Sequence, residues 1–155
     1  MKIRNYISAD CAEISKLFYA TVHTINAKDY TFHQLDAWAP KNINISDWDK
    51  SFLKNNTLVA ESNNIIIGFA DMDKTGYLNR LFVHKDFQGK GIASAILSEL
   101  ESQAIMQGIS FITAHASVTA KTFFEKHGYN VLRKNKVIRR NIELTNFIME
   151  KHLTK

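Results

Sequence analysis

Residues 82–94 read Phe82-Val83-His84-Lys85-Asp86-Phe87-Gln88-Gly89-Lys90-Gly91-Ile92-Ala93-Ser94, and this stretch decides the fold. The residues before it, 77–83, alternate and favour β structure, which predicts a strand. Those after it, 92–100, favour a helix whose apolar side chains share one face. Glycine at the joint opens backbone conformations closed to other residues and lets a ligand approach closely. The unpaired amides of the first helical turn, the helix dipole and the charge of Lys90 form an anion site. We interpret the stretch as a cradle for a diphosphate.

Two common phosphate-binding motifs are absent from the sequence. It contains no G-x-x-x-x-G-K-[ST], which excludes a P-loop, and no G-x-G-x-x-G, which excludes the dinucleotide fingerprint. The turn does contain Q-x-x-G-x-A, at Gln88, Gly91 and Ala93, after a strand that ends in Val83. An ordinary tight turn that caps a helix is the alternative interpretation, so the rest of the chain has to decide.

The composition is typical of one globular domain that covers residues 1–155. A length of 155 residues suits a single sizeable core, and 45% hydrophobic with 23% charged residues is usual for a soluble protein. No apolar run approaches the ~20 residues of a membrane span, and the N-terminus has no apolar signal region. A single cysteine, Cys11, cannot form an internal disulfide. We therefore expect a cytoplasmic protein without a membrane partner.

The positive charge of the chain is concentrated near its end. The net charge is +5, which favours polyanionic partners. Arg133, Lys134, Lys136, Arg139 and Arg140 lie within ten residues that contain no acid. Such a cluster indicates either contact with nucleic acid or a solvated strand pair. We favour the solvated strand pair, because no aromatic platform or recognition helix accompanies the cluster.

The first third of the chain is predicted to be mainly helical. We expect a strand over residues 2–7, then a helix over 10–26 that starts with a capping-box-like Asp10 and Glu13. Two short helices should begin at the capping pairs Thr31–Gln34 and Ser46–Asp49. These helices carry two tryptophans and could shape a pocket. A row of polar and aromatic side chains on the long helix could line the same cleft: Tyr19, His23, Asn26 and Tyr30.

The rest of the chain alternates strands with two helices. Tight turns at residues 63–64 and 73–76 predict an antiparallel meander. A strand after Gly108 would return in parallel, after a helical crossover. The expected ranges are strands over 57–61, 65–72, 77–83 and 111–114, a helix over 117–127, and a closing pair over 129–138 and 142–149. The order is β-α-α-β-β-β-α-β-α-β-β, an α/β (α+β) fold with a mixed sheet between helices.

This order resembles the GNAT (Gcn5-related N-acetyltransferase) fold from end to end. Gln88, Gly91 and Ala93 resemble the family's acetyl-coenzyme A signature, [QR]-x-x-G-x-[GA], which follows a strand ending in Val. Residues 120–129, Ala-Lys-Thr-Phe-Phe-Glu-Lys-His-Gly-Tyr, resemble its late helix pattern, A-x-x-[FL]-Y-x-x-x-G-[FY]. Three further stretches are similar to the YafP-like bacterial branch: residues 21–30, 34–40 and 143–147.

The resemblance implies direct transfer of an acetyl group from acetyl-coenzyme A to an amine, and no metal. A backbone amide near residues 81–83 would stabilise the tetrahedral oxyanion. The resemblance places the cofactor against the strand, the turn after it, the end of the next strand and the late helix. The cofactor-binding residues it implies are Leu81, Phe82, Val83, Gln88, Gly89, Lys90, Gly91, Ile92, Ala93, Ser94, Ser117 and Phe124.

The catalytic positions depart from the family pattern. Phe124 stands where many relatives carry a proton-donating Tyr, and Tyr77 and Asn79 stand on the strand where relatives often carry a Glu. His115 is our first candidate for the general base, because the pKa of histidine suits neutral pH. We expect it near the open end of its strand, with the cradle at the corresponding end of the neighbouring strand, so that the thioester comes close to His115. His23 is the second candidate and Tyr77 a candidate proton donor, while a surface or capping role is an equal alternative for each histidine.

Three functions remain open at this point. The first is an N-acetyltransferase for a small-molecule or peptide amine. The second is an acyl-coenzyme A-binding module with little catalysis, which the departure at Phe124 motivates. The third is an acetyltransferase that acts on charged tRNA, which the basic cluster motivates. The sequence does not decide between a monomer and a homodimer.

Overall fold

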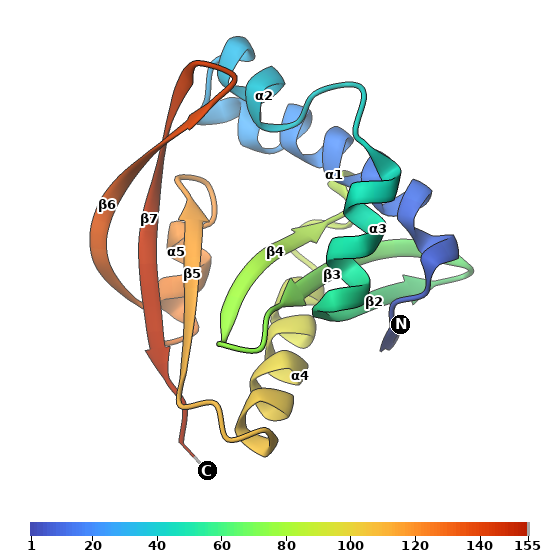
Figure 1. Cartoon of the computed structure of the whole chain (residues 1–155), viewed down its shortest axis with the longest axis vertical. Coiled ribbons are helices and arrows are strands. Elements are labelled where there is room, and N and C mark those ends of the chain that lie inside the picture. The colour runs from blue at the N-terminus through green and yellow to red at the C-terminus, as the bar shows by residue number, and fades with distance from the viewer. Residues whose placement is uncertain (155) are drawn as a thin grey trace.

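The computed structural model of the protein describes residues 1–154 and places them in one mixed sheet with helices on both faces (Figure 1). The sheet is seven-stranded, with the order β1-β2-β3-β4-β5-β7-β6. Its strands are β1 (Lys2–Asn5), β2 (Asn56–Ser62), β3 (Ile65–Met72), β4 (Tyr77–Val83), β5 (Phe111–Ser117), β6 (Asn130–Arg139) and β7 (Ile142–His152).

The helices cover both faces of this sheet. The α-helices are α1 (Cys11–Thr24), α2 (Phe32–Trp38), α3 (Ile45–Lys54), α4 (Ile92–Met106) and α5 (Lys121–Lys126). Short 3₁₀ turns are η1 (Ser8–Asp10), η2 (Asn26–Lys28) and η3 (Lys85–Phe87). Among residues 1–154, no helix is both long and apolar enough to cross a bilayer.

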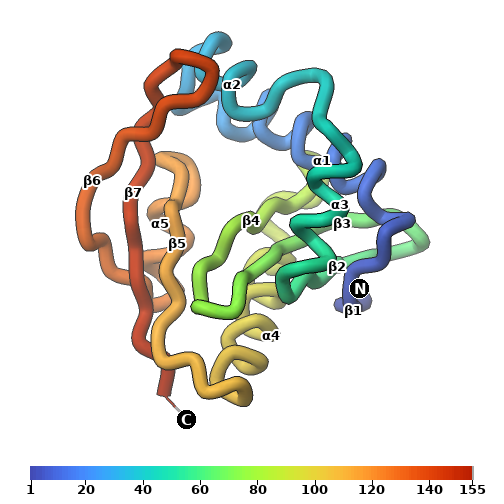
Figure 2. The backbone as a smooth tube through the Cα atoms, viewed as in Figure 1, coloured from blue at the N-terminus to red at the C-terminus, as the bar shows by residue number. Residues whose placement is uncertain are grey.

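The one parallel pairing in the described sheet is also its shortest. β4 and β5 pair only at Tyr77↔Thr113 and Leu78↔Ala114, and the two strands then separate (Figures 1 and 2). A register shift between Asp71 and Met72 of β3 leaves Asn79 unpaired in β4, and such a bulge bends a strand. Beyond Leu78, β4 therefore has an open edge on its β5 side, as far as the described residues show.

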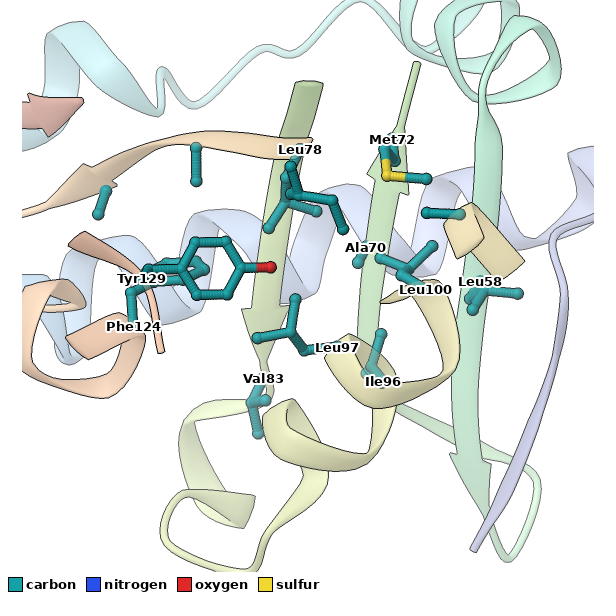
Figure 3. Close-up of a cluster of buried hydrophobic side chains, with 14 of the residues drawn as sticks. Leu58, Ala70, Met72, Leu78, Val83, Ile96, Leu97, Leu100, Phe124 and Tyr129 are labelled. Carbon is teal, nitrogen blue, oxygen red and sulfur yellow. The ribbon is translucent and has the colours of Figure 1, made fainter. Parts of the chain in front are cut away.

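Two hydrophobic clusters hold the helices to the sheet. On one face, Ile96, Leu97 and Leu100 of α4 pack against β4, where Leu78 and Val83 point towards them (Figure 3). On the other face, α1, α2 and α3 pack over β2, β3 and the start of β7; buried members there are Ile14, Phe18, Val22, Leu35, Phe52, Phe69 and Leu144. The space between the separated strands lies between these two layers.

Several predicted local signals are confirmed. The side chain of Thr31 accepts a hydrogen bond from the Gln34 amide, and the Gln34 side chain accepts one from the Thr31 amide. Asn63 and Asn64 adopt positive φ angles of 52° and 63° in the hairpin turn. The predicted bounds of β3 and β4 match the structure.

Two predicted element starts are wrong, and a third lacks its predicted capping bond. Asp10 is the N-cap residue of α1, but its carboxylate accepts from the Ile7 amide and pairs with Arg4, so it makes no side-chain bond to α1. Asn44, and not Ser46, caps α3, because its side-chain oxygen accepts from the Asp47 amide. Residues 117–120 are not helical: β5 extends to Ser117, whose hydroxyl accepts from the Ala120 amide in the turn before α5.

Candidate active site

A cavity of about 570 Å³ occupies the space where β4 and β5 separate. Its walls come from α1, α2, α3, β4, β5, α5 and the β6–β7 hairpin. The predicted site residues among its lining are Tyr77, Leu81, Phe82, Val83, Gln88, Ala93, His115, Ser117 and Phe124. The predicted residues that do not line it are His23, Gly89, Lys90, Gly91, Ile92 and Ser94.

The cradle residues outside the cavity lie at the start of α4, next to Gln88 and Ala93, which line it. Gly89 and Gly91 have φ angles of +74° and +78°, and a β-carbon at either position would meet nothing within 4 Å. Within residues 1–154, no group accepts a hydrogen bond from the backbone amides of residues 89–94. Six neighbouring donors at a helix N-terminus suit a phosphate or diphosphate.

Two predicted ligand side chains instead hold the cradle in shape. The side-chain nitrogen of Gln88, Nε2, donates to the Val83 carbonyl over 2.8 Å and closes the loop between β4 and α4. The Ser94 hydroxyl lies 2.8 Å from Nε2 of His127, whose Nδ1 lies 2.8 Å from the Phe123 carbonyl. Because a carbonyl only accepts, Nδ1 carries the proton and Ser94 donates to Nε2. Ser94 thus fastens the start of α4 to α5.

The remaining cradle side chains divide between core and solvent. The side chain of Ile92 is buried in the core that α4 forms with the sheet, so only its backbone amide faces a ligand. The exposed Lys90 has its Nζ 5.9 Å from the centroid of the Phe87 ring and pairs with no acid among the described residues. Its ammonium is therefore available to an anion at the cradle.

The open edge of β4 presents backbone donors to the cavity. The His84 amide donates to the Ile67 carbonyl over 2.9 Å, so every second residue of β4 bonds to β3. Leu81 and Val83 are the alternate residues, and their backbone groups face away from β3. The Val83 carbonyl already accepts from Thr21 and Gln88. The amides of Leu81 and Val83 are left to bond an extended ligand.

Tyr77 and His115 meet where β4 and β5 are still paired. Their ring centroids are 5.1 Å apart at 73°. No hydrogen bond to the Tyr77 hydroxyl or the His115 ring is found within residues 1–154. Burial lowers the pKa of His115, and the charges of Arg133 and Arg139 lower it further. Burial raises the pKa of Tyr77. At neutral pH the imidazole of His115 and the phenol of Tyr77 are therefore both uncharged.

The expectation that His115 lies beside the cradle is wrong. The register sets Ala114 beside Leu78, so His115 lies level with the beginning of β4. His115 follows Ala114 and so lies level with Asn79, and Val83 is four residues further along β4, which is roughly 13 Å along a strand. His115 and the cradle thus lie towards different ends of the open edge of β4, and the cavity connects them.

His23 is occupied elsewhere. Its Nε2 lies 2.8 Å from the Ala39 carbonyl, and its ring stacks on Tyr19 with a centroid distance of 4.2 Å. Since a carbonyl only accepts, Nε2 is protonated and holds the end of α2. Only the later members of the predicted helical row, Asn26 and Tyr30, line the cavity.

Sequence reasoning missed the charged groups of the site. Arg80 lines the cavity, with its Nη1 2.8 Å from Oδ2 of the fully buried Asp71, and its guanidinium packs over Trp48. Burial raises the pKa of Asp71 and outweighs the opposing charge of Arg80. A lone acid in the apolar strand at residues 65–72 was the available signal for this pair. Arg139 also lines the cavity, although the sequence suggested only a solvated cluster.

Comparison with known proteins agrees with this geometry. The family model of the acetyltransferase (GNAT) domain matches residues 26–151. The uncharacterized N-acetyltransferase YafP of Escherichia coli (strain K12) is 32% identical over 149 residues, which cover 96% of this chain and 94% of YafP.

Two solved structures have the same fold. A GCN5-related N-acetyltransferase from Rhodopseudomonas palustris, described as Aminotransferase, Class-II, has a TM-score of 0.95 at 29% identity, covering 98% of this chain and 95% of that one. The PaiA N-acetyltransferase from Thermoplasma acidophilum, in complex with coenzyme A, has a TM-score of 0.82 at 18% identity, covering 97% and 98%. The predicted fold and the YafP-like resemblance are confirmed, and the chain belongs to the GNAT acetyltransferase family.

Proposed function

We propose that this protein transfers an acetyl group from acetyl-coenzyme A directly to an amine held in the cavity. One observation carries the proposal: the unpaired amides of residues 89–94 and the open edge of β4 adjoin the same 570 Å³ cavity. Family membership supports it, as does the coenzyme A complex of PaiA from Thermoplasma acidophilum.

The cradle and the β4 edge suit the two polar parts of coenzyme A. The amides of residues 89–94 and the ammonium of Lys90 would hold the diphosphate. The amide of Val83 would bond the pantetheine as an added strand would, which leaves the amide of Leu81 facing the thioester. Phe124, buried against Phe123 and Tyr129, would supply an apolar wall.

The cavity also holds candidates for each proton transfer. The amine nitrogen attacks the thioester carbon, the C–S bond breaks, and the amine loses one proton while the thiolate gains one. The neutral imidazole of His115 would accept the amine proton, directly or through a water molecule. The amide of Leu81 would stabilise the oxyanion. The neutral phenol of Tyr77 would supply the thiolate proton, because Phe124 has none to donate.

The alternative is a module that binds acyl-coenzyme A without catalysis. Two measurements separate the alternatives: calorimetric titration with acetyl-coenzyme A, and release of free thiol in the presence of a panel of amines. We expect binding together with amine-dependent thiol release. Binding without thiol release for any amine would favour the module.

We propose that the basic cluster does not bind charged tRNA. Of the five charges in the cluster, Arg139 lines the cavity and Lys136 pairs with Glu143 over 3.2 Å, which leaves three for a nucleic acid. A gel shift with tRNA should show no complex at physiological salt. A complex that weakens steeply as the salt concentration rises would contradict this.

A further inference from the structure

The charges around the cavity have one sign. Its lining contains no aspartate, glutamate or lysine among the described residues, but it contains Arg80 and Arg139. The rest of the wall mixes uncharged polar side chains with apolar ones, and its aromatic members besides Phe123 and Phe124 are Phe18, Tyr30, Trp38, Trp48, Tyr77 and Phe82. An acceptor amine would therefore meet no carboxylate.

The two arginines differ in what they can bind. Arg80 is neutralised by the buried carboxylate of Asp71 at 2.8 Å and is held over Trp48. Arg139, at the end of β6, is exposed and makes no ion pair within residues 1–154. Its charge still acts on the site, since it lowers the pKa of His115 and opposes the rise in the pKa of Tyr77. Arg139 is thus an unpaired cation that lines the same cavity as the candidate base.

The aromatic wall is preformed on the helix side of the cavity. The ring of Phe18 lies 4.9 Å from that of Trp48 and 4.9 Å from that of Phe82, centroid to centroid. Trp38 packs on Tyr30 at 5.5 Å. Aromatic pairs of this kind form rigid apolar surfaces that suit a planar or branched apolar group.

This environment selects among amines. A polyamine or a lysine-rich peptide would bring further positive charge to a cavity without a counter-charge, which is unfavourable. A bound ammonium would also lose its proton more readily than in water, because burial and neighbouring cations both disfavour its charged form. A negative group on the acceptor, in contrast, would find Arg139.

We propose, as an extension of the function proposed above, that the acceptor is an amine that also carries a carboxylate and an aromatic or large apolar body. Arg139 binds the carboxylate, the body lies against Phe18, Trp38 and Trp48, and the amino group is directed to His115. Aromatic α-amino acids are the simplest molecules with these three parts.

Matched acceptors test the proposal. Phenylalanine and 2-phenylethylamine share a body and differ in the carboxylate, as tryptophan and tryptamine do, and spermidine represents the polycations. With the full-length protein and saturating acetyl-coenzyme A, kcat/KM should be higher for the amino acid in each pair and lowest for spermidine. Arg139→Gln should raise the KM of each amino acid relative to its decarboxylated amine roughly tenfold, as expected for one lost charge-assisted hydrogen bond. The ratio within each pair is the readout, because the charge of Arg139 also lowers the pKa of His115 for both acceptors.

Lys134→Gln is the matched control, since it removes one positive charge from β6 at a residue that does not line the cavity. Lys134→Gln should leave unchanged the ratio of kcat/KM between each amino acid and its decarboxylated amine. Equal or faster acetylation of the decarboxylated amines would overturn the carboxylate proposal while the acetyltransferase function stands. A protein that binds acetyl-coenzyme A by calorimetry but acetylates no amine would overturn the proposed function itself, and this inference with it.

Discussion

His115 is placed so that its neighbours keep its imidazole unprotonated. Partial burial, Arg133 and Arg139 all lower its pKa, and Tyr77 contacts it edge-on with a centroid distance of 5.1 Å. A histidine without its proton at neutral pH is ready to accept one from an amine.

Removal of the imidazole should therefore slow the acetyl transfer without weakening the binding of acetyl-coenzyme A. We expect His115→Ala to lower kcat by roughly 10²-fold, in the range of general bases, with the affinity for acetyl-coenzyme A unchanged by calorimetry. His23→Ala is the control, because His23 bonds to Ala39 outside the cavity. If His115→Ala turned over as fast as wild type, solvent or another group would have to be the acceptor of the amine proton.

The pH profile tests the electrostatic argument separately. A lowered pKa means that the base form of His115 appears at lower pH, so the acidic limb should rise through an apparent pKa below ~6.5. Arg133→Gln removes one of the charges that lower this pKa and should move the limb to higher pH. Comparison with wild type on the same acceptor cancels the titration of the amine itself. An unmoved limb would exclude His115 as its source.

At the scale of elements, α4 carries two glycines in the same backbone conformation at opposite ends. Gly91 and Gly108 both have a φ angle of +78°, and a β-carbon at either would meet nothing within 4 Å. Any side chain is therefore strained equally at both positions, but only Gly91 adjoins the unpaired amides of the cradle.

This pair separates ligand binding from backbone strain. Gly91→Glu should abolish binding of coenzyme A, because a side chain and a negative charge enter a site for phosphates. Gly108→Glu should destabilise the fold by a similar ~1 kcal/mol and bind coenzyme A as wild type does. Calorimetry on both folded variants is the measurement. Unchanged affinity in Gly91→Glu would show that the cradle does not hold the diphosphate.

The bulged segment of β3 and β4 depends on a buried ion pair. Asp71 is fully buried, and its Oδ2 accepts from Asn55, Asn79 and Arg80, while its Oδ1 has no partner among the described residues. Burial of this carboxylate is tolerated because three donors converge on one oxygen. The pair also holds Arg80 against Trp48 in the cavity wall.

Removal of one partner should be costly. Asp71→Ala should lower the free energy of unfolding in urea by about 3 kcal/mol, because the partly buried Arg80 is left without its counter-charge. The double variant Asp71→Ala with Arg80→Met should recover part of this loss, since no charge is then left unpaired. A single variant as stable as wild type would mean that the pair does not support the bulge.

At the scale of the whole molecule, the cavity joins two halves of the sheet that scarcely pair. Its walls take Leu81 and Val83 from β4 on one side, and His115 and Ser117 from β5 on the other. The two strands diverge in Figure 1. A ligand that contacts both sides replaces the strand pairing that is missing beyond Leu78.

Acetyl-coenzyme A should therefore stabilise the entire chain. At a concentration of ~100 Kd the gain is about 2.7 kcal/mol, which should raise Tm by roughly 5–10 °C for a chain of this size. Calorimetric melting should show the shift in wild type and in Gly108→Glu but not in Gly91→Glu. Hydrogen exchange should slow at the amides of Leu81 and Val83. Ligand binding without added protection there would place the pantetheine elsewhere.

The sequence alone determined the features that depend on neighbours along the chain. The strand and glycine turn before α4, the Thr31 cap, the Asn63–Asn64 turn and the order of elements all follow from local backbone preferences. These preferences act over a few residues, so they can be recognised in one sequence. For the same reason the cradle was predicted correctly as a strand-to-helix joint.

Tertiary structure alone decided the catalytic end of the site. The register that sets Ala114 beside Leu78 moved His115 away from the cradle, and a single contact with Ala39 removed His23 from the cavity. Arg139 became a cavity residue because the β6–β7 hairpin extends beyond its pairing with β5 and reaches α2, where Gln34 donates to the Glu143 carbonyl. Each outcome depends on pairing between residues far apart in the chain. Packing of the whole fold sets the energy of such pairings, and local preference does not.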